Sequence, residues 1–149
     1  MLMDNALVDQ EVGNYDSVYA LEAEMLKHEQ VDIKTEHDFC NGLYARTIHV
    51  PAGTIITGAE HKEENFFVVR SGSIAIYTEN GPQIFESGFM GSSPVGIKRA
   101  GYAITDVVFT TFHENKENIK DVLLIWKRLA VEDPTKSLEM VKNNALEHK

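Results

Sequence analysis

Short runs of β-branched and aromatic residues, separated by turn residues, fill the middle of the chain. The runs cover residues 43–50, 66–69, 73–78, 83–85, 97–104 and 106–113, with breaks at 51–53, 71–72, 80–81, 88, 91 and 94–96. Asn80-Gly81 favours a hairpin between the third and fourth runs. About seven or eight short strands, with turn signals roughly every 8 to 12 residues, indicate a closed antiparallel barrel or sandwich rather than βαβ units.

The two ends of the chain follow a helical period instead. Residues 17–29 predict an amphipathic helix after an N-terminal arm, residues 1–16, with Asp16 as its N-cap. Beyond residue 115, an apolar stripe predicts a second helix, and Asp133-Pro134 predicts the start of a third. The three apolar faces are Val18, Leu21, Met25 and Leu26; then Ile119, Val122, Leu123, Trp126 and Leu129; then Leu138, Val141 and Ala145. We interpret these faces as packing surfaces, and Trp126 with its neighbours as an alternative subunit contact.

Length and charge restrict the classes of function. With 149 residues the chain suits one domain, which we divide into an arm and helix (1–34), a barrel (35–114) and a helical extension (115–149). A net charge of −9 argues against nucleic-acid and anionic-membrane partners. The longest apolar run, residues 122–126, is too short to span a bilayer, and the first residues lack the pattern of an export signal. We therefore expect a cytoplasmic protein.

Cys40 is the only cysteine in the sequence, so no internal disulfide is possible. A chain that needs no disulfide fits a reducing compartment. We expect Cys40 to be a small buried or half-buried residue.

Two spaced motifs resemble those of the cupin superfamily, which are small jelly-roll barrels. The first family motif is Gly, five residues, His, one residue, His, three or four residues, Glu, six residues, Gly. Here it matches at Gly53, His61 and Gly72, but Ala59 replaces the first His and Asn65 replaces the Glu. The second motif matches at Gly88, Pro94 and Gly96, but Arg99 replaces its His and Ala103 its Asn. The resemblance covers about residues 43–113. It implies an all-β core, a small cupin jelly-roll β-barrel with one N-terminal helix and one or two C-terminal helices.

A narrower resemblance concerns two longer runs, YARTIHVPAGTIITGAEHKE and GIKRAGYAITDVVFTTFH. They are similar to uncharacterised cupin-like proteins encoded in tailed-phage and prophage genomes. This resemblance implies a phage-encoded protein of the host cell cytoplasm or the virion. Cupin barrels commonly pair, so it also implies a homo-oligomer or other assembly partners.

The substitutions in the motifs argue against a metal cofactor. Transition metals are held by three or four imidazole, carboxylate or thiolate ligands, whereas these positions supply one imidazole and one amide. The guanidinium of Arg99 is always charged, and about 4 Å from a divalent ion it costs on the order of 4 kcal/mol per unit-charge pair. A register shift of one residue would bring Glu60, Glu63 or Glu64 into the site and restore carboxylates. We predict no cofactor.

What remains is a candidate ligand-binding cluster of His61, Asn65, Arg99 and, from the last strand, His113. Arginine and histidine donors suit a small anionic or hydroxylated molecule. The alternative is structural, with Arg99 paired to Glu60 or Glu64 and His61 as a hydrogen-bonded wall residue. Lys98, next to Arg99, should point the opposite way, to solvent. Lys62, Tyr77 and Tyr102 are expected to be surface or wall residues.

Three functions fit this cluster. The first is a non-catalytic protein that serves assembly or binds a small molecule. The second is a metal-independent enzyme of the sugar epimerase or isomerase kind, with His61 as base and Tyr77 or Tyr102 as acid. The third is a metal-dependent oxygenase or isomerase, for which the motif positions supply too few metal ligands. The depleted ligand set favours the first function.

Overall fold

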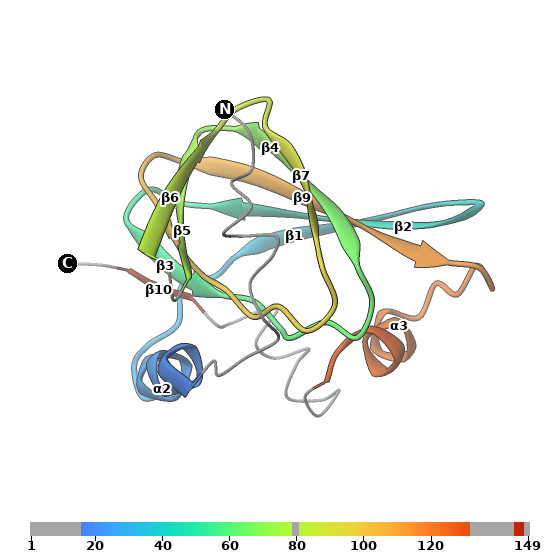
Figure 1. Ribbon diagram of the computed structural model, residues 1–149, viewed down its shortest axis with the longest axis horizontal. Coiled ribbons are helices and arrows are strands. Elements are labelled where there is room, and N and C mark those ends of the chain that lie inside the picture. Colours follow the sequence, from blue (N-terminus) through green and yellow to red (C-terminus); the bar gives the residue numbers. More distant parts are fainter. Residues whose placement is uncertain (1–15, 79–80, 132–144, 148–149) are drawn as a thin grey trace.

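The computed structural model describes residues 16–78, 81–131 and 145–147, and it contains two five-stranded antiparallel sheets. Their strand orders are β1-β2-β9-β4-β7 and β10-β3-β8-β5-β6. The sheets face each other and form a barrel (Figure 1). The strands are β1 (Lys34–Cys40), β2 (Gly42–Val50), β3 (Thr54–Thr57), β4 (Asn65–Ser71), β5 (Ser73–Thr78), β6 (Gly81–Glu86), β7 (Met90–Ser93), β8 (Ala100–Ala103), β9 (Val107–Asn115) and β10 (Ala145–Glu147).

The apolar core lies between the two sheets because the strands alternate inward apolar and outward polar side chains. Its buried members come from both sheets and from the segment before β1: Ile33, Ile48, Val50, Val69, Ile74, Ile76, Phe85, Ala103 and Val107. The predicted all-β jelly-roll barrel with helices at its N- and C-terminal sides is therefore confirmed.

The motif glycines stand at turns that require a left-handed backbone. Gly53, Gly72, Gly88 and Gly96 have φ between 79° and 93°. At Gly72 a Cβ would also lie 2.0 Å from the backbone oxygen of Asp106, so only glycine fits between β4 and β5. The turns predicted from the glycines of the two motifs are therefore present in the fold.

Most strands lie where the sequence predicts them, but β3 and three others do not come from the predicted runs. β5 and β6 pair antiparallel, as the predicted hairpin requires, with Thr78 opposite Gly81. By contrast, β1, β7 and β10 fall in segments that the apolar pattern does not mark. β1 is an edge strand with alternating exposed and half-buried positions, which explains its polar sequence. Cys40, at its end, is exposed, so the expectation of a buried cysteine is wrong.

Helix α2 (Asp16–Met25) is the predicted N-terminal helix, and it is shorter than expected. Val18 and Met25 are buried as predicted, whereas Leu26 lies beyond the helix and is exposed. The helix also buries the carboxylate of Glu22, which accepts hydrogen bonds from Thr57 Oγ1 (2.7 Å) and Lys98 Nζ (3.1 Å). α2 is therefore held on the barrel by ionic contacts as well as by apolar ones.

Helix α3 (Val122–Leu129) begins at Asp121, whose carboxylate caps the amides of Leu123 and Leu124. Its buried face consists of Ile125, Trp126 and Leu129, and it packs on Tyr44 and Ala59 of the same chain. Trp126 is 1% exposed and packs within the chain, so a subunit contact on this helix would use its exposed neighbours Leu123 and Leu124 and stays a prediction. Leu123 is also misplaced by the sequence pattern, because it faces solvent and Ile125 takes the inward position.

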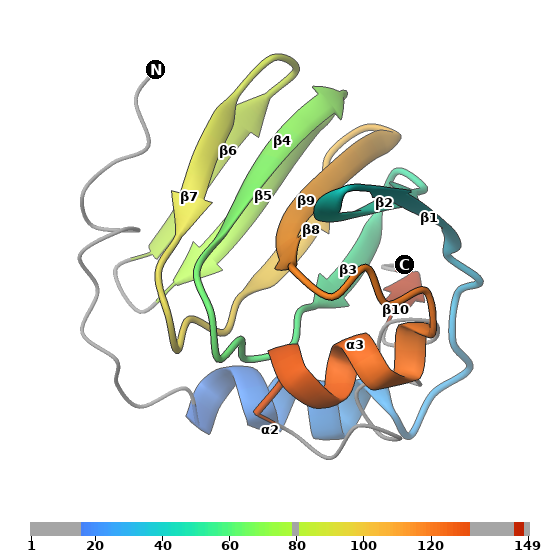
Figure 2. The ribbon, with the colours of Figure 1, turned by 90° about the vertical axis from the view of Figure 1, so that its right-hand side faces the viewer.

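Both helices lie at the same end of the barrel, where β3 ends and β4 begins (Figure 2). The third predicted helix falls mostly on residues 132–144, outside the described residues, and Ala145 belongs to β10, which pairs with β3. None of the helices in the described ranges is long and apolar enough to cross a membrane.

Candidate functional site

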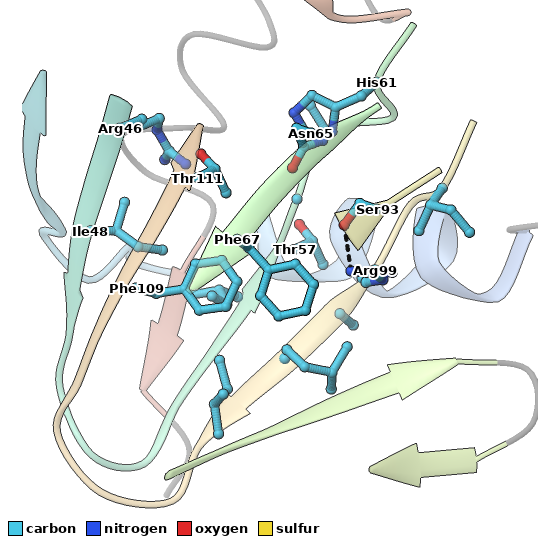
Figure 3. Close-up of a pocket in the computed structure, with 18 of the residues that line it drawn as sticks. Arg46, Ile48, Thr57, His61, Asn65, Phe67, Ser93, Arg99, Phe109 and Thr111 are labelled. Atoms are coloured by element: carbon cyan, nitrogen blue, oxygen red, sulfur yellow. Dashed lines mark hydrogen bonds between the residues drawn. The ribbon is translucent and has the colours of Figure 1, made fainter. Parts of the chain in front are cut away.

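A cavity of about 130 Å³ lies between the sheets and reaches the end of the barrel that carries the helices. Its walls come from seven strands, two loops, α3 and the segment before β1. The lining residues are Ile33, Arg46, Ile48, Ile56, Thr57, Gly58, Ala59, His61, Asn65, Phe67, Ile74, Ile76, Ser93, Ile97, Arg99, Ala100, Gly101, Phe109, Thr111 and Trp126. The close-up shows most of these side chains converging on the space between the sheets (Figure 3).

Three of the four substituted motif positions meet around this cavity, together with the retained His61. Ala59, His61, Asn65 and Arg99 all line it, whereas Ala103 is a fully buried core residue. Ala59 and His61 reach the cavity from a loop rather than from a strand, because β3 ends at Thr57. His61 is held there by a bridge to Ala130, directly after α3.

The residues at the cavity do not fit the metal that a cupin motif implies. Of the four motif positions, Ala59 offers no ligand atom, Asn65 offers an amide, and Arg99 is a fixed cation. Glu60, Glu63 and Glu64 do not line the cavity, so the register that would restore carboxylates is not the one adopted. Across the described part of the chain, no three His, Cys, Asp or Glu side chains are grouped to hold a metal ion.

The guanidinium of Arg99 points into the barrel and is fixed by two contacts. Its Nη1 donates to Ser93 Oγ (2.8 Å), and its Cζ lies 5.5 Å from the ring centroid of Phe67. Both partners also line the cavity. The side chain is thus preorganised to offer donors to a molecule inside the barrel.

Arg46 is a second cation in the cavity, and the sequence analysis missed it. It projects from β2, and its Cζ lies 5.7 Å from the ring centroid of Trp126. Burial lowers the pKa of Arg46 to about 10, which leaves the guanidinium charged at neutral pH. The sequence does indicate this inward direction. Arg46 alternates with Ile48 and Val50, whose apolar side chains mark the inward face of the strand.

Asn65 supplies a buried donor. It is 6% exposed and lies at the start of β4, and its Nδ2 has no hydrogen-bond partner among the described residues. A buried amide without a partner is costly, so this group favours an acceptor atom inside the cavity. An anionic oxygen would satisfy it.

His113 lies outside the cavity lining, next to His61. The two imidazole centroids are 5.4 Å apart, and His113 also packs against Tyr44 and Trp126. Burial holds the pKa of His113 well below its usual value, and His61 and Arg46 act in the same direction. Burial likewise raises the pKa of Tyr44 to about 12. The structure thus brings His61, Asn65 and Arg99 together around the cavity, with His113 behind His61.

Lys98 points away from Arg99 as expected, but it does not reach solvent. It is 1% exposed; its Nζ donates to Glu22 and, at 2.7 Å, to the carbonyl of Gly58, and lies 4.5 Å from the ring centroid of Tyr19. The expectation of an exposed Lys98 fails because α2 covers this part of sheet β10-β3-β8-β5-β6. Lys98 therefore anchors the loop that carries Arg99 to the N-terminal helix.

Comparison with known proteins gives similarity only to solved structures. No family model matches this sequence, and no curated protein matches it. A cupin-2 domain containing protein from Shewanella frigidimarina NCIMB 400 is 13% identical, over 70% of this chain and 95% of that chain, with a TM-score of 0.47. A conserved protein of unknown function from Streptococcus pyogenes is 18% identical, over 60% and 79%, with a TM-score of 0.48. A cupin superfamily protein from Desulfitobacterium hafniense DCB-2 is 6% identical, over 58% and 81%, with a TM-score of 0.49. Similarities of this degree do not decide the ligand or the activity.

Proposed function

We propose that this chain is a cupin-like, non-catalytic protein that binds a small anionic molecule inside its barrel. The observation that carries the proposal is the composition of the cavity. Arg46 and Arg99 bring two guanidinium groups and Asn65 brings an unpartnered amide donor, while no residue of the described lining is Asp or Glu. In a chain with a net charge of −9, such a cavity selects negative charge.

The arrangement does not favour acid–base catalysis. An epimerase or isomerase needs a base and a positioned acid within reach of the same substrate. His61 lines the cavity, but Tyr77 and Tyr102, the acids expected from the sequence, line a different depression on the outer side, beside α2. Binding without chemistry therefore fits the geometry better.

The test uses Trp126, the only tryptophan of the chain, which lines the cavity. Its emission should change saturably when a small anion enters, and the same anion should raise the melting temperature. We propose a panel of acetate, benzoate, citrate and phosphate, measured up to about 10 mM, against wild type and the variants Arg46→Gln and Arg99→Gln. A charge-assisted hydrogen bond contributes about 1.5–3 kcal/mol, so each variant should weaken binding by roughly 10- to 100-fold.

Arg70→Gln is the matched control because Arg70 is exposed and does not line the cavity. It removes the same charge and should leave affinity unchanged. Equal losses in Arg70→Gln and Arg99→Gln would mean that only net charge matters, and the site would be rejected. The same conclusion follows if no anion of the panel changes the emission or the melting temperature.

A second candidate function, assembly, is favoured by an apolar patch on the outer face of sheet β1-β2-β9-β4-β7. The patch consists of Phe66, Met90 and Phe112, which are 56%, 62% and 37% exposed. Phe66 lies directly opposite Phe112, and Met90 opposite Val68 on the next strand. We infer that a second copy of the chain covers this patch, because two identical apolar patches are self-complementary about a two-fold axis.

Light scattering tests this inference. Wild type should scatter as a dimer, and Phe66→Ser with Phe112→Ser should scatter near the 16.7 kDa of one chain. Ile84→Ser, which removes an exposed apolar side chain on the other sheet, is the control and should remain dimeric. A wild type that stays monomeric at high concentration would exclude the dimer.

The resemblance to phage-encoded cupin-like proteins supports a narrower proposal. We propose that the protein acts in the cytoplasm of an infected host or within the virion. Mass spectrometry of purified virions and of infected-cell lysate would distinguish the two locations, and absence from both would reject the proposal.

A further inference from the structure

We propose that the ligand of the cavity is an amphipathic monocarboxylate of about the size of benzoate, held by its carboxylate at one of the two guanidinium groups of the wall, Arg46 or Arg99, and by its hydrocarbon part in the interior of the barrel. This inference rests on the proposed function and adds the chemical class of the ligand.

The first argument is the order of polar and apolar side chains on the inward faces. On β2, Arg46 is followed two residues deeper by Ile48, and on β9 Thr111 is followed by Phe109. Arg46 is paired with Thr111 and Ile48 with Phe109, so each pair forms one layer across the sheet. Layers on one face are about 7 Å apart. On both strands the inward side chains therefore change from polar to apolar between one layer and the next, going from the helix end of the barrel toward its interior.

The opposite sheet continues the apolar part. Ile56, Ile74 and Ile76 line the cavity from β3 and β5, and the rings of Phe67 and Phe109 stack at 5.3 Å between their centroids. In Figure 3 these two rings lie side by side, below the side chains of Arg46, Thr111 and Asn65. A ligand that contacts either guanidinium must therefore place its other atoms against hydrocarbon.

The size of the cavity limits the ligand to a small molecule. At about 130 Å³ it is comparable to the engineered cavity of roughly 150 Å³ that binds benzene. A ring or a short branched chain fits this space, whereas a nucleotide or a sugar nucleotide does not. A second or third carboxylate would lie against isoleucine without donors, which disfavours polyanions.

The experiment compares four probes that separate charge from hydrocarbon, with wild-type protein and Trp126 emission as the readout. Benzoate carries both features, acetate carries the charge alone, benzyl alcohol carries the ring alone, and citrate carries several charges. Burial of the ring should make benzoate bind on the order of 10- to 100-fold more tightly than acetate. Benzyl alcohol and citrate should both bind more weakly than benzoate.

One substitution tests the position of the hydrocarbon part. Gly101 lines the cavity, and a Cβ there would meet Ile74 Cδ1 at 3.3 Å and Ile56 Cγ1 and Ile76 Cδ1 at 3.5 Å. Gly101→Ala therefore adds a methyl group among the isoleucines and should weaken benzoate several-fold while acetate binding is unchanged. Gly42→Ala is the control, because Gly42 does not line the cavity and a Cβ there would meet nothing within 4 Å.

The outcomes separate the inference from the proposed function. If citrate or phosphate binds through Arg99 and benzoate binds no more tightly than acetate, the proposed function stands and the inference fails. If benzyl alcohol binds as tightly as benzoate, charge plays no part and both fail. If Gly101→Ala weakens acetate as much as benzoate, the hydrocarbon part does not lie among the isoleucines, and the inference fails.

Discussion

The ion pair between Lys98 and Glu22 offers the sharpest test of how the N-terminal helix is held on the barrel. The side chain of Lys98 is 0% exposed and that of Glu22 is 4% exposed, with Nζ 3.1 Å from Oε2. Lys98→Met keeps most of the volume and the unbranched stem but removes the ammonium group. The carboxylate of Glu22 would then be buried without a cation.

The size of the effect follows from this burial. Removing one partner of a buried pair costs about 3–5 kcal/mol, because the remaining charge is uncompensated. The hydroxyl of Thr57 still donates to Glu22 at 2.7 Å, which offsets about 1 kcal/mol. We therefore expect Lys98→Met to lower the free energy of unfolding by about 3 kcal/mol, equivalent to a fall in Tm of roughly 6–12 °C for a chain of this length. Glu22→Gln combined with Lys98→Met should recover at least half of the loss.

Urea unfolding followed by Trp126 emission measures these changes. The matched control is Lys27→Met in the pair of Lys27 with Glu24, which has the same 3.1 Å separation but side chains that are 71% and 61% exposed. Its removal should produce a barely measurable change, because water already solvates both groups. Since the two pairs share geometry and differ in burial, the comparison isolates desolvation.

Two results would refute this reasoning. A loss below about 1 kcal/mol in Lys98→Met would mean that the pair behaves like an exposed one. A double variant that loses the sum of the two single losses would mean that the charges do not act on each other.

Three further predictions test other parts of the structure. Burial depresses the pKa of His113, so on acidification the unfolded chain takes up a proton that the folded chain does not. The free energy of unfolding is therefore at its full value above the ordinary His pKa near 6.5. It falls as the pH drops below that value, by at most about 1.4 kcal/mol per pH unit. Thermal melts from pH 8 to 5 should show this slope, and His113→Gln should reduce it; an unchanged slope would contradict the assignment. Gly72→Ala should cost more than 1–2 kcal/mol in urea unfolding, since the backbone of Asp106 blocks a Cβ, whereas Gly42→Ala, with a similar φ and open space, should cost less. Finally, exposed Cys40 should react with a thiol-reactive disulfide dye in the native protein at nearly the rate of the unfolded protein; a reaction that requires unfolding would contradict its exposure.

The central strands and the glycine turns could be predicted from the sequence because each depends on local signals. The runs that became β2, β4, β5 and β9 have apolar residues on a buried face, and this burial produces the alternating pattern. The missed strands β1 and β7 are the two edges of their sheet, where one side of the strand faces solvent and polar residues are tolerated. Their formation depends on pairing with a neighbour rather than on their own pattern.

The site was predictable only where a motif marked it. Spacing placed His61, Asn65 and Arg99 together, and the structure shows all three at one cavity. Arg46 carries no motif, and its inward direction follows from the pairing of β2 with β9. Lys98 was assigned to solvent because alternation describes the two faces of a strand but not what covers them. Whether a helix covers the outer face depends on tertiary packing, which the sequence of the strand alone does not indicate.

The cationic cavity and the weak metal ligand set have a common physical basis. A metal site in this barrel would require side chains with lone pairs that can coordinate an ion. The side chains that line the cavity here instead include guanidinium and amide groups, which donate hydrogen bonds. The glycine turns that shape the barrel leave a space between the sheets, and the wall of this space carries two guanidinium groups. Two guanidinium groups in the wall of an apolar cavity are stable only if their desolvation is offset, and the aromatic faces of Trp126 and Phe67 offset part of it. A bound carboxylate would offset more, which is why the stability of the protein and its affinity for an anion should change together when either arginine is replaced.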